Sequence, residues 1–305
     1  MTRPQTIVAA IDFSTPSKVS LTLAADLAER AGAVLHLVHA DVLFRSGTAE
    51  VPDATPSATL RLQLERFAAD ALGPDGAEIA VVRDVAPAAA ILRHVSEVDA
   101  DLVVVGTHGR SGVTRLLLGS VAEAVVAVAP CPVLSVPGEA VGLSPSPDAP
   151  VLVAVDFSER SRAVLAAGRA LAELYGAPVE LVHVVRGAGP YPPFAPELLS
   201  VTDVDPGKAG LVRERLRRFA GGATDAPPAE CHLAYGTPSR VVPALAVERG
   251  VGAIVMGTHG RTGLARIIGS VAEATLHRAP CPVLTLKEVE RLGGPSIPVR
   301  SALAS

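Results

Sequence analysis

One feature of this sequence constrains the fold more than any other: a glycine-rich stretch in the first half returns almost unchanged in the second. Residues 106–128 read GTHGRSGVTRLLLGSVAEAVVAV, and residues 257–279 read GTHGRTGLARIIGSVAEATLHRA. In a chain of 305 residues, a copy at about half the chain length indicates two similar domains in tandem. We expect a first domain at residues 1–140, a linker at 141–150, a second domain at 151–288 and a tail at 289–305.

Each glycine-rich stretch follows a short apolar run that suits a buried strand. The runs are Leu102–Val105 and Ala253–Met256, and both carry β-branched residues. Across each half, strand-like runs alternate with helical apolar spacing in the order βαβαβαβαβ. Such strands pair in parallel through right-handed crossovers, so we expect an α/β fold of two tandem, doubly wound, five-stranded parallel-sheet domains. In the first half the predicted strands are 7–11, 34–39, 78–82, 102–105 and 132–136, and the predicted helices are 17–31, 57–72, 87–98 and one that begins at 119–120.

The glycines begin where the strand ends, and they indicate a site for a negatively charged group. Gly106 and Gly109 lack Cβ atoms, so the backbone can turn tightly and approach a ligand, and Gly119 and Ser120 open a helix-forming run. Backbone N–H groups at a helix start, the positive end of the helix dipole and a serine hydroxyl all favour a phosphate. The GxxxxGK[ST] pattern does not occur, so this is not a Walker loop.

An acidic residue, Asp12, stands at the end of the first predicted strand. In a doubly wound sheet a ligand binds outside the carboxyl ends of the strands where the winding reverses, so Asp12 and the Gly106 loop should share a pocket. A carboxylate beside a phosphate site suits ribose hydroxyls or a bound Mg²⁺, which favours a nucleotide as ligand. The alternative is that Asp12 is the N-cap of the following helix, with Ser14 nearby, and both roles are compatible.

These residues resemble the ATP-binding branch of the universal stress protein family, in its tandem two-domain form. The mark of that branch is G-x2-G-x9-G-S/T, which Gly106, Gly109, Gly119 and Ser120 fit, and Asp12 supplies the acid after the first strand. The resemblance covers about residues 7–286 and implies a Rossmann-like fold of the adenine nucleotide alpha hydrolase type. It implies that backbone groups near Ala40 hold adenine, that Asp12 and Gly106 hold ribose, and that Gly109, Gly119, Ser120 and Val121 hold the phosphates. The implied set also includes Ala10, Val105 and Arg110.

The same resemblance implies a second site, with ATP as the ligand of both. The carboxylates Asp12 and Asp156 suit Mg²⁺ as a cofactor beside the phosphates. One departure separates the halves: eight residues lie between Gly260 and Gly269, whereas nine lie between Gly109 and Gly119. The missing residue either shifts the helix start by about an ångström, which weakens phosphate hydrogen bonds, or is absorbed by the flexible turn. We therefore expect tighter binding in the first half. The predicted residues of the second site are Ala154, Asp156, Val184, Met256, Gly257, Gly260, Arg261, Gly269, Ser270 and Val271.

Other residues of the loops leave alternatives open. The arginines of the two loops either neutralise phosphates or remain solvated on the surface; they are Arg110, Arg115, Arg261 and Arg266. A histidine between two glycines, as at His108 and His259, more often packs or bonds the backbone than acts as a general base. The Pro-rich segment 186–199, which accounts for extra length in the second half, reads as a surface connection or as a lid.

Composition argues against several classes of function. A net charge of −4, 3% aromatic residues and the lack of a basic run argue against nucleic acid binding. No apolar run reaches the roughly 18–20 residues of a spanning helix, so we expect no membrane insertion. Three cysteines do not make a disulfide framework, and a reducing cytoplasm is the expected compartment. We expect Cys131 and Cys281 to be small buried side chains that do not form a bridge.

The sequence favours a binding module: an ATP-sensing stress protein whose nucleotide state changes how it meets an unidentified protein partner. The alternatives are a slow ATPase or autophosphorylating enzyme, with Ser120 or Ser270 as phosphoryl acceptors, and a scaffold without nucleotide. An apolar fifth strand left bare would aggregate, so we expect residues 132–136 and 282–286 to pair about a pseudo-two-fold axis, forming an intramolecular pseudo-dimer. A homodimer of two such chains is a further expectation.

Overall fold

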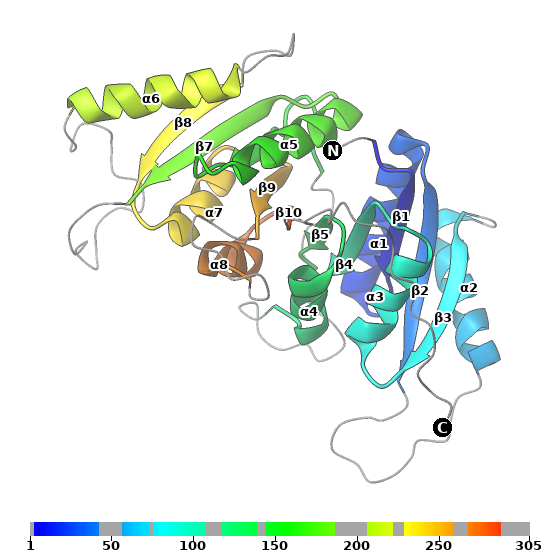
Figure 1. The fold of residues 1–305 in the computed structure, drawn as a ribbon. Helices are drawn as coiled ribbons and strands as arrows, with labels where there is room; N and C mark the ends of the chain where they lie inside the picture. The colour runs from blue at the N-terminus through cyan, green and yellow to red at the C-terminus, as the bar shows by residue number, and fades with distance from the viewer. Residues whose placement is uncertain are drawn as a thin grey trace, which may run out of the picture.

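The two halves of the chain contribute to one continuous β-sheet, with helices on both of its faces (Figure 1). The computed structural model describes residues 3–42, 57–73, 76–107, 118–138, 144–186, 206–221, 229–258 and 268–287. In these ranges ten strands form the sheet, in the order β3-β2-β1-β4-β5-β10-β9-β6-β7-β8. Within each half all neighbouring strands are parallel, which confirms the predicted α/β fold.

The helices and strands alternate through both halves, as the periodicity of the sequence predicts. In the first half they are β1 (Thr6–Ala10), α1 (Thr15–Ala31), β2 (Val34–Val42), α2 (Ser57–Leu72), β3 (Glu78–Asp84), α3 (Pro87–Glu97), β4 (Leu102–Gly106), α4 (Ser120–Val128) and β5 (Val133–Val136). In the second half they are β6 (Val151–Ala154), α5 (Arg160–Tyr175), β7 (Val179–Val185), α6 (Pro206–Ala220), β8 (Glu230–Tyr235), α7 (Pro238–Glu248), β9 (Ala253–Gly257), α8 (Ser270–Arg278) and β10 (Val283–Leu286).

The halves meet where β5 pairs with β10, and these two strands run antiparallel. Val133 lies opposite Thr285, and Ser135 lies opposite Val283. The hydroxyl of Thr285 also donates to the carbonyl of Val133 at 3.1 Å, so a side chain reinforces the backbone ladder. The expected pairing of the fifth strands is confirmed, and we call this pair the seam.

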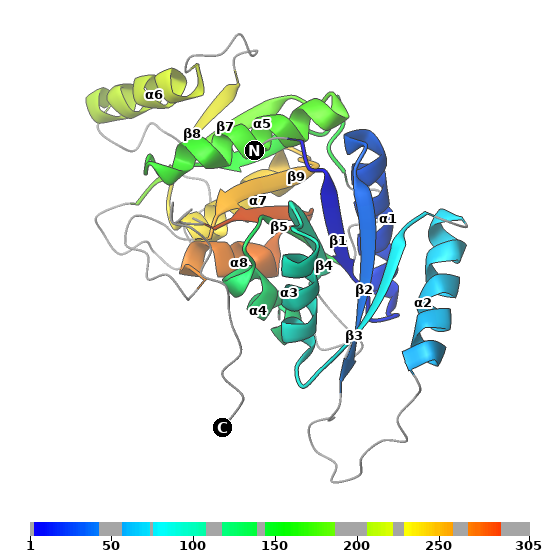
Figure 2. The same cartoon turned by 45° about the vertical axis from the view of Figure 1, so that its right-hand side comes forward.

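The hydrophobic core forms two layers, one on each face of the sheet, and both layers cross the seam. The first layer joins Leu27 of α1 to Leu171 of α5, and the second joins Val125 of α4 to Leu276 of α8. Figure 2 shows α1 and α3 on opposite faces of the first half. Because apolar side chains of the two halves share each layer, separating the halves would expose core surface to water.

Local signals in the sequence explain where the elements begin and end. Helix α1 ends at Ala31 and is capped by Gly32, whose φ of 61° lies in the left-handed region that glycine adopts without strain. It begins at Thr15, two residues before the predicted start, because the hydroxyl of Ser14 accepts a hydrogen bond from the N–H of Ser17. Strand β2 extends to Val42, beyond the predicted end, since Asp41 and Val42 pair with residues of β3.

Cys281 is buried, as the sequence predicts, whereas Cys131 is only partly buried. Cys131, Cys231 and Cys281 are all free thiols. Burial raises the pKa of both Cys131 and Cys281 to about 12, so these thiols stay protonated at neutral pH. The antiparallel seam places the starts of β5 and β10 at opposite ends of the pair, which separates Cys131 from Cys281.

Candidate functional site

The carboxyl ends of β1 and β4 lie side by side at the point where the winding of the first half reverses. From β1 the chain adds β2 and β3 on one side, and then returns to add β4 and β5 on the other. Ala9 pairs with Val104 in parallel register, so the loops after Ala10 and after Gly106 leave the same edge of the sheet. In doubly wound folds this switch point is where ligands bind.

Asp12 follows β1, and its carboxylate organises the turn into α1. The N–H and the hydroxyl of Ser14 both donate to Oδ1 of Asp12, at 3.0 and 2.5 Å. The N–H of Asp12 in turn donates to the hydroxyl of Ser17 at 3.0 Å. The N-cap of α1 is Ser14, so the alternative in which Asp12 itself is the N-cap is wrong. Asp12 is half-buried at the sheet edge and supports the cap through Ser14.

Phe13, between Asp12 and Ser14, has a φ of 63°, which is rare for a bulky side chain. Its ring packs on His39, with centroids 4.4 Å apart, and edge-on against Phe67 at 5.7 Å. The Nδ1 of His39 lies 2.7 Å from the carbonyl of Ile11; a carbonyl only accepts, so Nδ1 carries the hydrogen. Packing from β2 and α2 therefore holds the strained turn in which Asp12 lies.

The second loop of the site runs from Gly106 to the start of α4, and its described ends are tightly fixed. The N–H of Gly119 donates to the carbonyl of Thr107 at 2.7 Å. A Cβ atom on Gly119 would lie only 3.2 Å from that oxygen, so a glycine suits this close approach. The carbonyl of Gly119 accepts from the N–H of Glu123 at 2.9 Å, which starts α4.

The first turn of α4 presents donors at this edge of the sheet. The first N–H groups of any helix have no partner within the helix, and the helix dipole makes this end positive. Among the described residues, no side chain caps α4 at Gly119. The N–H groups of Ser120 and Val121 and the exposed hydroxyl of Ser120 are thus the groups that would meet an anion.

The second half repeats the Asp12 turn with a different serine arrangement. Oδ1 of Asp156 accepts from the N–H of Ser158 at 3.0 Å and from the hydroxyl of Ser161 at 2.9 Å. Burial raises the pKa of Asp156, but hydrogen bonds from Ser158 and Ser161 outweigh burial, and the net pKa is lowered. Asp156 is therefore a carboxylate at neutral pH.

The strained phenylalanine and the helix start also recur. Phe157 has a φ of 60° and packs on His183, with ring centroids 4.3 Å apart. His183 Nδ1 lies 2.8 Å from the carbonyl of Val155. The N–H of Gly269 donates to the carbonyl of Thr258 at 2.7 Å, the same distance as in the first half. Both halves thus have the same arrangement at this edge of the sheet: an aspartate turn held by a phenylalanine–histidine pair, beside a helix that starts after a glycine.

Comparison with known proteins identifies this doubled arrangement. The sequence profile of the universal stress protein family matches residues 4–137 and again residues 149–287. The chain belongs to the universal stress protein family. A universal stress protein of Mycobacterium tuberculosis (strain ATCC 25618 / H37Rv) is 32% identical over 193 residues, which are 62% of this chain and 63% of that protein. One from Thermus aquaticus is 38% identical over 134 residues, 43% of this chain and 98% of that protein.

Solved structures agree on the fold across nearly the whole chain. A universal stress protein from Archaeoglobus fulgidus DSM 4304 is similar with a TM-score of 0.64 at 21% identity, covering 92% of this chain and 98% of that one. A functionally unknown protein from Pseudomonas aeruginosa PAO1 is similar with a TM-score of 0.64 at 19% identity, covering 94% and 93%. Within the described residues of this family member, no helix is long and apolar enough to cross a membrane.

The structure places most of the predicted site residues at one edge of each half. In the first half Ala10, Asp12, Val105, Gly106, Gly119, Ser120 and Val121 lie at or after the ends of β1 and β4, and Ala40 lies near the end of β2. In the second half Ala154, Asp156, Val184, Met256, Gly257, Gly269, Ser270 and Val271 occupy the equivalent places. Gly109, Arg110, Gly260 and Arg261 lie outside the described residues, as do His108, Arg115, His259, Arg266 and nearly all of the segment 186–199.

The sequence reasoning missed the residues that brace the site. Phe13 and His39 are 26 residues apart, and Phe157 and His183 have the same spacing. This spacing could have predicted the contact, because two residues that keep the same sequence separation in both repeats are candidates for a contacting pair. The serine hydroxyls are harder to assign, since Ser14 binds Asp12 whereas Ser161 binds Asp156.

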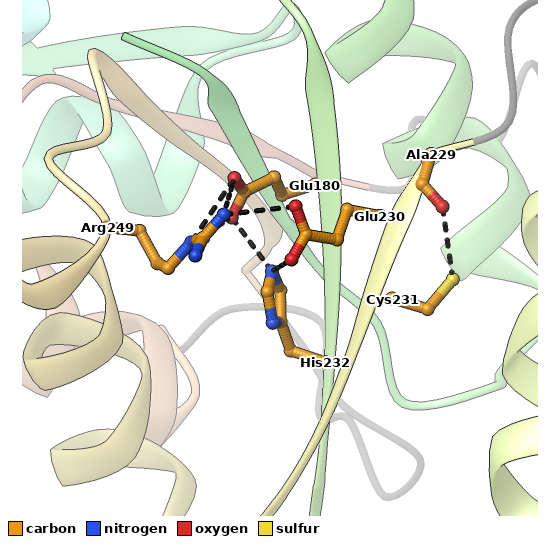
Figure 3. Close-up of polar contacts among 6 residues, drawn as sticks. All are labelled: Glu180, Ala229, Glu230, Cys231, His232 and Arg249. Atoms are coloured by element: carbon orange, nitrogen blue, oxygen red, sulfur yellow. Dashed lines mark hydrogen bonds and ion pairs between the residues drawn. The ribbon is translucent and has the colours of Figure 1, made fainter.

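A second polar cluster lies at the opposite, amino-terminal edge of the second half (Figure 3). Glu180 is buried, and its carboxylate accepts from Arg249 at 2.8 Å and lies 2.8 Å from Nε2 of His232. Arg249 also pairs with Glu230 at 3.0 Å. Glu180, Glu230 and His232 each offer one atom that could bind a metal ion, and these three atoms lie within 4.8 Å of one another. The guanidinium bonds both carboxylates, so the cluster is an ion-pair network.

Proposed function

We propose that this chain is an ATP-binding universal stress protein, a nucleotide-sensing module that regulates an as yet unidentified protein partner. One observation carries the proposal: the turn of Asp12 and the start of α4 leave the same edge of the sheet, at the switch point. An acid suited to ribose beside donors suited to phosphate matches the two ends of a nucleotide. The family membership of the chain supports it.

The proposed binding mode assigns one part of the nucleotide to each strand end. Backbone groups near Ala40, at the end of β2, would bind adenine, and Asp12 with Gly106 would bind ribose. The phosphates would lie at the start of α4, against the N–H groups of Gly119, Ser120 and Val121, with Gly109 completing the loop. Because β1 lies between β2 and β4, this order spreads the nucleotide across the ends of three adjacent strands.

Mg²⁺ fits the proposed site by the chemistry of its donors. Mg²⁺ prefers oxygen ligands and is often held by one or two carboxylates together with phosphate oxygens. Asp12 is a half-buried carboxylate at the edge where the phosphates would lie, and Asp156 is its equivalent. When bound, the ion would neutralise phosphate charge; the residues of the chain would orient the nucleotide.

We propose binding rather than catalysis as the primary role. The described hydroxyls nearest Asp12, those of Ser14 and Ser17, are engaged in fixing the turn. Such bracing pre-organises a binding site. Enzymatic turnover remains the alternative, with Ser120 or Ser270 as phosphoryl acceptor. We further propose a cytoplasmic location, which the free thiols Cys131, Cys231 and Cys281 suit.

Calorimetric titration of the full-length chain with MgATP tests the proposal. We expect saturable binding, tighter at the first-half site, and weakened by Asp12→Ala. Absence of binding by ATP, ADP and AMP would overturn it. Incubation with γ-labelled ATP separates the roles: intact ATP after many hours supports a binding module, whereas released phosphate or labelled Ser120 would favour the enzyme.

A further inference from the structure

Leu118, two residues before the start of α4, is bound by the second half of the chain. The N–H of Leu118 donates to Nδ1 of His277 at 2.8 Å, a contact between residues 159 positions apart. His277 lies in the last turn of α8, and Leu118 is buried in the core layer that also contains Leu276. A side chain of one half thus reaches the proposed phosphate-binding region of the other.

Two successive amides are fixed by this arrangement, each to a different half. The N–H of Leu118 is bound by His277, and the next N–H, that of Gly119, is bound by Thr107 of its own half at 2.7 Å. Helix α4 begins directly afterwards, at Ser120. The position of its first N–H groups therefore depends on both bonds, because two consecutive planar peptide groups, each held by a hydrogen bond, restrict where the next residue can lie.

The other end of α4 is also bound by the second half. The ammonium group of Lys287, directly after β10, donates to the carbonyl of Ala127 at 2.8 Å. A cation at a helix C-terminus satisfies a carbonyl left without a helical partner and matches the negative end of the dipole. With nine residues, α4 is short enough for its two ends to move together.

At the equivalent positions, the first half has no residues that could make these two contacts to the second half in return. Gly119 aligns with Gly269, an offset of 269 − 119 = 150 residues, and the same offset aligns His277 with Ala127 and Lys287 with Pro137. A methyl group cannot accept from the N–H of Ile268, and proline has no side-chain donor. The contacts made by His277 and Lys287 therefore have no equivalent at Ala127 and Pro137 of the first half.

We propose that His277 is a positioning residue that pre-organises the first-half phosphate-binding region, so that the second half regulates nucleotide affinity in the first. This inference rests on the proposed function and adds that one half of the chain, the second, controls nucleotide affinity in the other. Accepting the Leu118 N–H requires neutral His277 with its hydrogen on Nε2. The oxygen of an asparagine lies near the place of Nδ1, so Asn can replace the acceptor whereas Ala removes it.

The experiment measures MgATP affinity of the full chain by calorimetry in two backgrounds. In the Asp156→Ala background the second-half site is weakened, so the titration measures the first-half site. In the Asp12→Ala background it measures the second-half site. His277→Ala should weaken first-half binding about three- to tenfold, the range that one net hydrogen bond spans. His277→Asn should restore it, and second-half binding should not change. Arg278→Ala, at the next and exposed position of α8, is the matched control and should have no effect.

Hydrogen exchange at the Leu118 amide provides a readout that does not depend on nucleotide. We expect protection in the wild type and in His277→Asn, and faster exchange in His277→Ala. Unchanged first-half affinity in His277→Ala, or an equal loss in both backgrounds, would overturn the inference while the proposed function stands. A wild type that binds no nucleotide would overturn the proposed function, and the regulatory inference with it.

Discussion

The imidazole of His39 packs on the ring of Phe13 and bonds the carbonyl of Ile11 at 2.7 Å, so one side chain of β2 secures the turn that follows β1. Phe13 has a φ of 63°, a conformation that costs of order 1–3 kcal/mol and persists only where the surroundings impose it. His183 and Phe157 repeat this relationship in the second half. The brace and the aspartate beside it therefore form one unit.

Replacing His39 by alanine should destabilise the protein by about 1–3 kcal/mol, because the buried carbonyl of Ile11 loses its donor and Phe13 loses packing. Chemical denaturation measures the change. His183→Ala is the matched variant and should cost a similar amount. A loss below about 0.5 kcal/mol in both variants would show that the turn holds without the histidines.

Asp12→Ala should weaken ATP binding in the first half by about ten- to hundredfold, the effect of losing a charged hydrogen bond. Calorimetry reports the affinity, and a thermal melt checks that the chain stays folded. Asp26→Ala is the control, since Asp26 forms an exposed i,i+4 pair with Arg30 on the same helix that Asp12 precedes. Equal affinities for wild type and Asp12→Ala would remove Asp12 from the site.

Gly119→Val should weaken binding in the first half at least tenfold, because even a Cβ atom would lie 3.2 Å from the carbonyl of Thr107 and a branched side chain must displace the helix start. Gly210→Val is the control, at a position where a Cβ would meet no atom within 4 Å. We expect the same loss of binding for Gly109→Val, on the sequence pattern alone. Full affinity in Gly119→Val would contradict the proposed role of α4.

Arg249→Ala should destabilise the chain by about 1–3 kcal/mol, because it leaves the buried carboxylate of Glu180 without its guanidinium partner. The exposed pair of Arg218 and Glu214 provides the contrast, and Arg218→Ala should change stability by less than about 1 kcal/mol. Urea unfolding of both variants makes the comparison. Similar losses of stability in Arg249→Ala and Arg218→Ala would show that the burial of Glu180 does not determine the effect.

The same cluster predicts a pH dependence of stability. Burial raises the pKa of Glu180, but hydrogen bonds from Arg249 and His232 outweigh it, and the net pKa is lowered. A carboxyl with a lowered pKa in the folded state stabilises the fold above its unfolded pKa of about 4.3, and this contribution is lost as pH falls through the folded value. Melting temperatures of wild type and Glu180→Gln should therefore converge progressively as pH falls below about 4.3. A constant difference across pH 3–7 would contradict this origin.

Much of the fold follows from local sequence, and the differences arise from contacts between distant residues. The bounds of α2 agree with the pattern because Ser57–Leu72 has continuous helical spacing. The end of β2 does not, because Asp41 and Val42 are strand residues only through pairing with Arg83 and Asp84. Tertiary pairing thus decides element ends where local propensity is weak.

The candidate site divides in the same way. Asp12, Gly119 and Ser120 could be predicted because each stands at a strand end or a helix start, where chain position alone indicates the chemistry. The left-handed Phe13 could not, since bulky residues rarely adopt that conformation. The contact of His277 with Leu118 could not either, because only one repeat carries the histidine and the partner is a backbone amide.

The seam has a consequence for how such molecules associate. A chain with only one of these halves would leave β5 as an open edge, and pairing two such chains would depend on their concentration. Here the second half is covalently attached, so the edge is paired at any dilution. The outer strands of the sheet are β3 and β8. Within the described part of the chain, a second copy that binds by strand addition would dock at β3 or β8, the strands farthest from the seam in the strand order.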